Sequence, residues 1–211
     1  MKLLTVATDI NRDGLDHLIH SSQKQGWDIE ILMTEQWLGF GTKLISVYDY
    51  LLKNKDVKEF IFVDAYDVIA LGTPKEFEEK IQDRSKMLIS VEKGCWPQSD
   101  LADQYPKVDT DWKYINSGAY YSPSKLFIEM FDGNTPQYID DDQLWLTKEF
   151  LNNPTNKVLD YGCDIFQSYS FIADDDFEYD YQRVHNLKTY STPIFLHGNG
   201  KTNMDKIIEL L

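Results

Sequence analysis

Residues 60–67 read Phe-Ile-Phe-Val-Asp-Ala-Tyr-Asp, an uninterrupted apolar run that ends abruptly in two aspartates. A continuous run of four apolar residues is typical of a strand covered on both faces, as in parallel sheets flanked by helices. In open sheets of this kind, ligands bind outside the carboxyl ends of the strands. The sequence therefore predicts that Asp64 lies at the sheet edge where chemistry is usually found.

The spacing of the two aspartates decides whether they can act together. A regular strand would point the side chains of Asp64 and Asp67 to opposite faces, so they converge only if the chain turns after Asp64. Two converging carboxylates form a hard-oxygen site suited to Mg²⁺ or Mn²⁺. The alternative is an ordinary turn at a strand end, in which the aspartates cap the backbone.

A second apolar run, within residues 193–201 (PIFLHGNGK), also ends in a side chain that can bind a metal. His197 follows the run, and the two glycines after it allow close approach of the backbone to a ligand. An imidazole beside two carboxylates shifts the preferred metal from Mg²⁺ toward Mn²⁺. Lys201 is a cation that could meet a diphosphate. The alternative is a turn before a terminal helix, with no role for the histidine.

Two further segments carry residues suited to a sugar. Asp141 and Asp142 open a predicted helix, where they could hold sugar hydroxyls or face an electron-poor sugar carbon, although capping of the helix is a complete structural explanation. Trp96 lies in a loop and is followed by Asn-Ser-Gly at 116–118. A tryptophan ring can cover a sugar face and amides can pair with its hydroxyls, but both features also occur in plain loops.

The charge of the chain limits its partners. The 211 residues carry 21 Lys and Arg against 35 Asp and Glu, a formal net charge of −14. Such a surface repels phosphate backbones and anionic lipid, which argues against nucleic acid and membranes as partners. It would also repel an anionic substrate, unless a metal or a local basic group receives it.

The length and the segment pattern predict one α/β domain. No repeat or linker divides the chain, no apolar run approaches the roughly 20 residues that span a bilayer, and the early acidic residues do not suit a secretory signal. We therefore expect a cytoplasmic protein. Alternating strand and helix patterns predict a mostly parallel sheet with helices on both faces. The expected strands are 3–7, 28–32, 60–63, 87–91, 114–121 and 193–196. The expected helices are 14–25, 43–52, 74–81, 124–131 and 140–151.

Taken in order, several motifs resemble one family, the glycosyltransferase domain at the N-terminal end of procollagen lysyl hydroxylases, which is related to the collagen β-galactosyltransferases. The matching stretches run nearly end to end, and CWP together with HGNG makes the resemblance specific. The stretches are TVAT at 5–8, GFGTK at 39–43, FVDAYDVIALGTP at 62–74, SVEKGCWPQSDLADQYP at 90–106, YINSG at 114–118, DDDQLWLTKEFL at 140–151, LDYGCDIFQ at 159–167 and TPIFLHGNG at 192–200.

The resemblance implies a GT-A-type, Rossmann-like nucleotide-sugar-binding fold and transfer from a UDP-sugar with Mn²⁺ or Mg²⁺. By position, Asp64, Asp67 and His197 look like the metal ligands, and Tyr66 looks like the residue that lies against uracil. The other positions that the resemblance places at the nucleotide or its phosphates are Thr5, Thr8, Trp37, Lys43, Asn199, Gly200 and Lys201. The positions that it places around the sugar and the acceptor are Trp96, Asp141 and Asp142.

The chain departs from the family pattern at three points. The acidic run before Gln143 is shorter and begins after Ile139. Asn203 stands where the family carries a lysine, while Lys201 occupies the position of a proline and could replace it. Ala119 stands where the family has a second glycine, which would narrow the acceptor cleft.

We therefore expect a metal-dependent glycosyltransferase that moves glucose or galactose from a UDP-sugar to a hydroxyl of a peptide or glycan. Residues 1–110 would form the nucleotide-binding half, and residues 111–211 the half that completes the metal and acceptor sites. The resemblance implies hydroxylysine or galactosyl-hydroxylysine of a collagen-like protein as the acceptor. The alternatives are a non-catalytic UDP-sugar-binding module and a metal-dependent nucleotidyltransferase or phosphohydrolase.

Overall fold

The structure is a computed structural model that describes residues 1–173, 175–180 and 183–209, except for the side chains of Lys201 and Lys206. Its strands are β1 (Lys2–Ala7), β2 (Ile29–Met33), β3 (Glu59–Val63), β4 (Val68–Ala70), β5 (Met87–Glu92), β6 (Tyr114–Pro123), β7 (Lys157–Leu159), β8 (Phe166–Ser168), β9 (Phe177–Asp180), β10 (Arg183–Asn186) and β11 (Phe195–His197). Its α-helices are α1 (Leu15–Gln25), α2 (Gly41–Lys53), α3 (Pro74–Lys80), α4 (Ser124–Glu129), α5 (Asp142–Asn152) and α6 (Asp205–Ile208).

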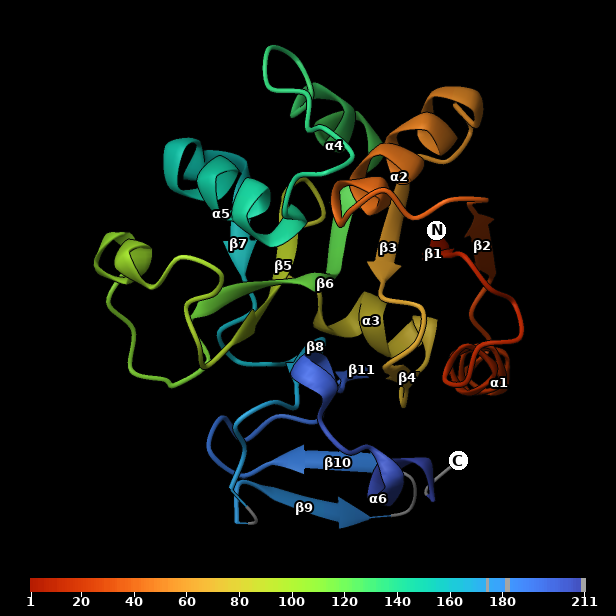
Figure 1. The fold of residues 1–211 in the computed structure, drawn as a ribbon. Coiled ribbons are helices and arrows are strands. Elements are labelled where there is room, and N and C mark those ends of the chain that lie inside the picture. Colours follow the sequence, from red (N-terminus) through yellow and green to blue (C-terminus); the bar gives the residue numbers. More distant parts are fainter. Residues whose placement is uncertain (174, 181–182, 210–211) are drawn as a thin grey trace.

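Six strands form the central sheet in the order β2-β1-β3-β6-β5-β7 (Figure 1). The pairs β1–β2, β1–β3 and β5–β7 are parallel, and β6 runs antiparallel to both of its neighbours. The prediction of a mostly parallel sheet flanked by helices is therefore confirmed. The reversed direction of β6 was not foreseen, because the segment that leads into it from β5 contains only a short 3₁₀ turn instead of a crossover helix.

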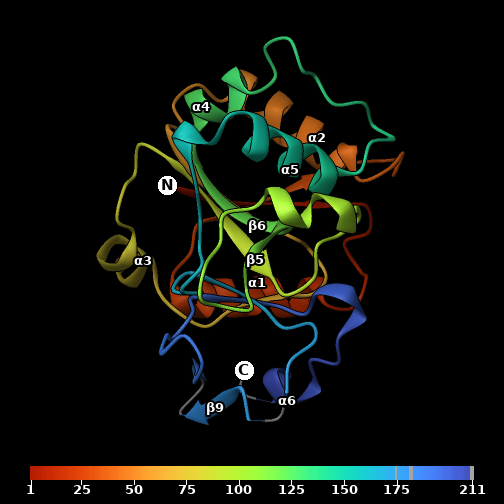
Figure 2. The ribbon, with the colours of Figure 1, turned by 90° about the vertical axis from the view of Figure 1, so that its left-hand side faces the viewer.

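Alternate residues of β3 supply the cores on the two faces of this sheet. Phe60 and Phe62 belong to the cluster that includes buried side chains of α2, α4 and α5. Ile61 and Val63 belong to the cluster that includes Leu15 of α1 and Phe77 of α3. Figure 2 shows these helices on opposite sides of the sheet. The apolar run at 60–63 is covered on both faces, as predicted, because neighbouring side chains of a strand point in opposite directions.

A smaller sheet, in the order β4-β11-β8, lies beyond the carboxyl end of β3 (Figure 1). β11 pairs antiparallel with β4, and the register places His197 opposite Val68. β4 and β8 were not expected, since strands of three residues are too short to show a hydrophobic period. Their pairing with β11 brings the last part of the chain next to the residues that follow β3.

The remaining strands, β9 and β10, form a separate antiparallel pair. They fall in and after the acidic, aromatic stretch 174–182, of which residues 174, 181 and 182 lie outside the described residues. Among the helices in the part of the chain that the structure describes, none has the length and apolar character needed to cross a membrane.

Candidate active site

The chain turns between β3 and β4, and this turn brings Asp64 and Asp67 together. The backbone N–H of Asp64 donates to the carbonyl of Gly118 at 2.8 Å, so Asp64 extends the pairing of β3 with β6 in the large sheet. The N–H of Gly198 donates to the carbonyl of Asp67 at 2.7 Å, so Asp67 belongs with the small sheet. The side chains of two sheets therefore meet where the turn joins them.

His197 completes this cluster at the end of β11. Its Nε2 atom lies 3.3 Å from Oδ1 of Asp67 and 3.7 Å from Oδ2 of Asp64. The ligand atoms of the three side chains all lie within 4.8 Å of one another, and no other group of this kind occurs among the described residues. Two carboxylate oxygens and one imidazole nitrogen fit a divalent cation such as Mn²⁺. The three side chains that the sequence singled out as ligands thus lie together.

Asp67 and His197, the closest pair in the cluster, each stabilise the charged form of the other. Burial alone would raise the pKa of Asp67, but the adjacent His197 outweighs it and holds this pKa below its usual value. Burial alone would lower the pKa of His197, but Asp67 and then Asp64 raise it. The corner between the two sheets is therefore electrostatically suited to a positive charge.

Gly118 of β6 packs directly against the cluster. A Cβ atom at this position would come within 2.1 Å of Cε1 of His197 and 2.8 Å of Oδ2 of Asp64. Both distances are shorter than non-bonded atoms tolerate, so a larger residue would displace two of the three ligands. The glycine of the Asn-Ser-Gly segment is thus a spatial requirement of the site.

Lys43 links the cluster to α5. Its Nζ atom lies 2.7 Å from Oδ1 of Asp64 and 2.8 Å from Oδ2 of Asp142. Burial disfavours the charged ammonium, but Asp142 and Asp64 nevertheless raise the pKa of Lys43 above its ordinary value. A fixed positive charge therefore stands between a metal ligand and the acidic start of the helix.

The two aspartates at this helix have different roles. Oδ1 of Asp141 accepts a hydrogen bond from the backbone N–H of Leu144 at 2.8 Å, which makes Asp141 the N-cap. Asp142 is buried and pairs with Lys43. The capping interpretation therefore accounts for Asp141, whereas Asp142 is linked to the cluster through Lys43, which also pairs with Asp64.

Glu92, the last residue of β5, is a buried carboxylate to which the sequence analysis assigned no role. It accepts hydrogen bonds from Nδ2 of Asn116 at 3.0 Å, Nε2 of Gln143 at 2.9 Å and Nδ2 of Asn199 at 3.0 Å. Burial raises the pKa of Glu92, although the amide donors oppose the shift. A signal for this residue was present, since it ends an apolar strand in a carboxylate just as Asp64 does.

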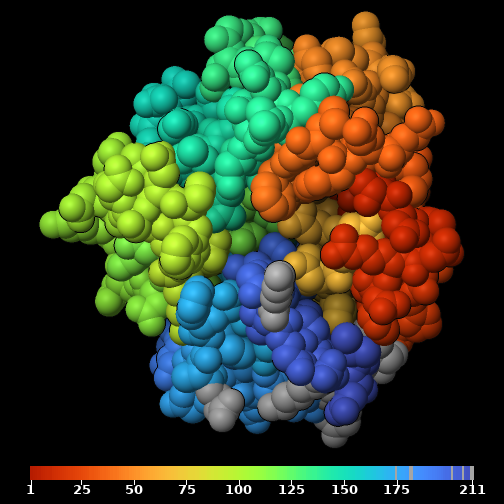
Figure 3. All heavy atoms as spheres, in the orientation of Figure 1, coloured from red at the N-terminus to blue at the C-terminus, as the bar shows by residue number. Residues whose placement is uncertain are grey.

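Two cavities meet at the cluster, and the space-filling view shows the surface hollowed at the centre of this face (Figure 3). Their volumes are about 670 Å³ and about 610 Å³. Residues that line both are Arg12, Phe40, Lys43, Asp64 and Asp67. A ligand that spans the two cavities would therefore pass directly over the metal-binding side chains.

Tyr66 is held in a fixed position in the smaller cavity. Its phenolic oxygen accepts hydrogen bonds from the backbone N–H groups of Thr8 at 2.9 Å and Asp9 at 3.1 Å. Burial would raise the pKa of Tyr66, but these hydrogen bonds outweigh it and lower the value. The guanidinium of Arg12 lies 4.2 Å from the ring centroid. The sequence analysis did not identify Arg12, whose partner is 54 positions away in the chain.

The remaining site residues of the sequence analysis fall into three groups. Thr8 and Trp37 line the smaller cavity, whereas Trp96, Asn199 and Gly200 line the larger one. Thr5 is fully buried in β1 and lines neither cavity, which does not support a contact with a nucleotide. The side chain of Lys201 lies outside what the structure describes.

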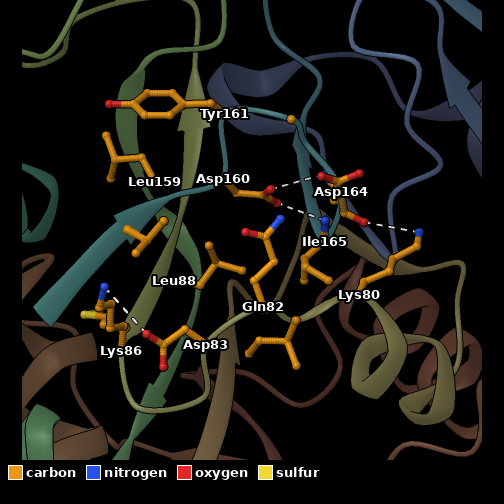
Figure 4. A pocket seen from close by; sticks show the side chains of 14 residues that line it. Lys80, Gln82, Asp83, Lys86, Leu88, Leu159, Asp160, Tyr161, Asp164 and Ile165 are labelled. Carbon is orange, nitrogen blue, oxygen red and sulfur yellow. Dashed lines mark hydrogen bonds and ion pairs between the residues drawn. The ribbon is translucent and has the colours of Figure 1, made fainter. Parts of the chain in front are cut away.

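A third cavity, of about 380 Å³, lies away from the cluster beside β5 and β7 (Figure 4). Its buried carboxylate, Asp160, accepts hydrogen bonds from the backbone N–H groups of Asp164 at 3.0 Å, Ile165 at 2.9 Å and Phe166 at 2.8 Å. Burial raises the pKa of Asp160 to about 6. Because the backbone already uses this carboxylate, the cavity does not compete with the cluster as a candidate site.

Comparisons with known proteins find relatives over most of the chain. The chain is 30% identical over 221 residues to the human protein named "Multifunctional procollagen lysine hydroxylase and glycosyltransferase LH3", an alignment that covers 96% of this chain and 30% of that protein. It is 37% identical over 170 residues to "Uncharacterized protein R699" of Acanthamoeba polyphaga mimivirus, covering 79% of this chain and 36% of that protein. The chain thus spans about a third of the length of these curated relatives.

The fold also resembles a solved structure, titled "Crystal structure of a glycosyltransferase involved in the glycosylation of the major capsid of PBCV-1". The TM-score is 0.56 at 12% sequence identity, and the alignment covers 99% of this chain and 96% of that one. At this identity the likeness concerns the fold alone. The family described as the PLOD GT domain matches residues 1–208. The chain therefore belongs to the PLOD GT domain family of glycosyltransferases, as its motifs predicted.

Proposed function

We propose that the protein is a metal-dependent glycosyltransferase that moves glucose or galactose from a UDP-sugar to a hydroxyl group of an acceptor. The observation that carries this proposal is the cluster of Asp64, Asp67 and His197 at the junction of two cavities. Membership of a glycosyltransferase family supports group transfer as the chemistry.

Asp64, Asp67 and His197 would hold the divalent cation, for which Mn²⁺ suits the mixed oxygen and nitrogen donors. When bound, the cation supplies a Lewis acid that stabilises the negative charge gained by the departing diphosphate. Its presence would also explain how a chain of net charge −14 accepts an anionic donor. The buried ammonium of Lys43 adds a second positive charge at the same junction.

The smaller cavity suits the nucleotide. Tyr66 and Trp37 give it two aromatic side chains, and Thr8 adds a polar group. The hydrogen bonds that Tyr66 accepts from the backbone fix its ring before any ligand arrives. A uracil ring would therefore bind to a surface that loses little freedom on binding.

The larger cavity suits the sugar and the acceptor. Asp141 and Asp142 line it, and their negative charge would favour the positive character that the anomeric carbon develops as the diphosphate leaves. Trp96 is 53% exposed, so its ring is free to cover a sugar or peptide surface.

We propose a collagen-like acceptor, with hydroxylysine or galactosyl-hydroxylysine as the hydroxyl that receives the sugar. The motifs shared with the lysyl hydroxylase domains support this choice, as does the name of the human relative. The acidic surface also suits a lysine-rich chain, since opposite charges favour the encounter of the two partners.

The test is UDP release from UDP-glucose and UDP-galactose with Mn²⁺, with a chelator as control and with peptide and glycan acceptors analysed by mass spectrometry. We expect UDP and a glycosylated product that require the metal. Binding of UDP and Mn²⁺ without turnover would contradict catalysis and identify a nucleotide-sugar-binding module. Formation of UMP or of a new pyrophosphate would instead identify a phosphohydrolase or a nucleotidyltransferase.

A further inference from the structure

The two ring nitrogens of His197 have different neighbours. Nε2 faces the carboxylates of Asp64 and Asp67, whereas Nδ1 lies 3.0 Å from Oδ1 of Asn116. A neutral imidazole binds a metal through the nitrogen that carries no proton. If Nε2 is to be the ligand atom, the proton must reside on Nδ1, and Nδ1 then needs an acceptor.

The side-chain amide of Asn116 supplies that acceptor only in one of its two orientations. Its Nδ2 atom lies 3.0 Å from Oε1 of Glu92, and its Oδ1 atom accepts from the backbone N–H of Gly118 at 3.0 Å. A carboxylate accepts and a backbone N–H donates, so both contacts favour the same orientation. If the amide were rotated by half a turn, its oxygen would face the carboxylate oxygen of Glu92 and its NH₂ group would face the backbone N–H of Gly118. Neither contact would then be a hydrogen bond.

Glu92 is itself held in place. Oε1 also accepts from Gln143 at 2.9 Å, and Oε2 accepts from Asn199 at 3.0 Å. The carboxylate is 4% exposed, so water does not readily replace these donors. Its position is thus determined by segments that lie outside the metal-binding cluster.

We propose that Glu92 is a positioning residue that, through the amide of Asn116, keeps the proton of His197 on Nδ1 and leaves Nε2 free to bind the metal. This inference rests on the proposed function, since it assigns the proton that the metal site requires. Partners of this kind beyond the direct ligands fix the tautomer and the orientation of metal-binding histidines.

The first test replaces Glu92 by leucine, which removes both acceptor oxygens while filling a similar space. Asn116 then loses one of the two contacts that orient it and keeps only the backbone N–H of Gly118. We expect the Mn²⁺ affinity of Glu92→Leu, measured by calorimetry on metal-stripped protein, to fall roughly 10- to 100-fold. The matched control is Glu149→Leu, because Glu149 is also a buried carboxylate that accepts from an asparagine amide, Nδ2 of Asn134, but lines neither cavity at the cluster. Its Mn²⁺ affinity should stay at the wild-type value.

A double variant, Glu92→Gln with Asn116→Asp, covers the case in which Glu92→Leu does not fold. It moves the carboxylate one step nearer to His197, where the new amide donates to the new carboxylate. The amide no longer accepts from Gln143, whose Nε2 keeps the carbonyl of Trp96 as its partner. The second carboxylate oxygen can then only accept from Nδ1, so the tautomer is kept. We expect this variant to bind Mn²⁺ with near wild-type affinity, whereas a weakened affinity would contradict the proposal.

The direct readout is the protonation of the two ring nitrogens, from ¹⁵N NMR of histidine-labelled, metal-free protein at a pH where the ring of His197 is neutral. We expect protonated Nδ1 in the wild type and in the double variant, and a mixture of tautomers in Glu92→Leu. A wild-type ring protonated on Nε2, or an unchanged tautomer in Glu92→Leu, would overturn the inference. If the tautomers behave as expected but the wild type takes up no Mn²⁺, the proposed metal-dependent function fails instead.

Discussion

Asp64 and Asp160 both follow a strand at its carboxyl end, but they use their oxygens differently. The carboxylate of Asp160 accepts from the backbone N–H groups of three residues that follow it closely in the chain, at positions 164–166. Asp64 faces the side chains of Lys43 and His197, which come from distant parts of the chain. A strand-end aspartate therefore does not by itself mark a functional site. The distinguishing feature is convergence of charged side chains from separate segments.

The largest expected effect follows from removing one ligand of the cluster. Asp67→Ala should lower metal-dependent turnover roughly 10³-fold. The substitution removes a ligand of the cation, and the cation would stabilise the charge of the departing diphosphate by several kcal/mol. The side chain of Asp67 is 39% exposed, so the substitution should leave the fold intact. Steady-state kinetics and Mn²⁺ titration measure the effect.

The matched control is Asp83→Ala, which removes an exposed acid that lines the third cavity. Its Mn²⁺ affinity should equal that of the wild type. If Asp67→Ala kept the wild-type Mn²⁺ affinity, Asp67 would not be a metal ligand. The proposed difference in metal binding between the regions of Asp64 and Asp160 would then be contradicted.

The converse substitution, Asp160→Ala, should affect stability and not metal binding. It leaves three backbone N–H groups without their acceptor, and we expect the free energy of unfolding to fall by roughly 3 kcal/mol. Urea denaturation measures this loss, and Mn²⁺ titration of the folded variant should give the wild-type affinity. Loss of Mn²⁺ binding by a folded Asp160→Ala protein would show that the two regions are coupled.

The parts of the site that could be predicted were those that the sequence itself places at strand ends. Asp64, Asp67 and His197 each follow or end an apolar run, and they do lie together. The contact of Thr5 with the nucleotide, by contrast, was predicted from resemblance alone. The side chain of Thr5 is fully buried within β1. Position in a motif does not reveal on which face of a strand a residue lies.

What could not be predicted depends on partners far apart in the chain. Asn116 binds Glu92 across 24 positions and His197 across 81, so no local pattern marks the link. The same holds for β4, a strand of three residues that exists because β11 pairs with it. Local sequence predicts the long strands to within two residues at each end, whereas tertiary pairing determines the short strands and the polar network.

A smaller effect is expected from two glycine substitutions that compare the regions directly. In Gly118→Ala the new methyl group would collide with His197 and Asp64, and Mn²⁺ affinity should fall roughly 10- to 100-fold, as it does when the support of a ligand is lost. In Gly162→Ala the nearest atom is Oδ2 of Asp164, at the end of an exposed side chain that can move aside. Calorimetric Mn²⁺ titration should therefore separate the two variants, and equal affinities would contradict the steric argument.

The smallest effect concerns the pH dependence of Asp160. Its pKa in the folded state is about 6, above the ordinary value, because burial disfavours the charged form. Its stabilising contribution is therefore complete below the ordinary pKa and is lost as the pH rises through 6. Between pH 5 and pH 7 the difference in unfolding free energy between wild type and Asp160→Ala should shrink by roughly 1 kcal/mol. A difference that grows with pH would instead mean that the three backbone hydrogen bonds outweigh burial and favour the carboxylate.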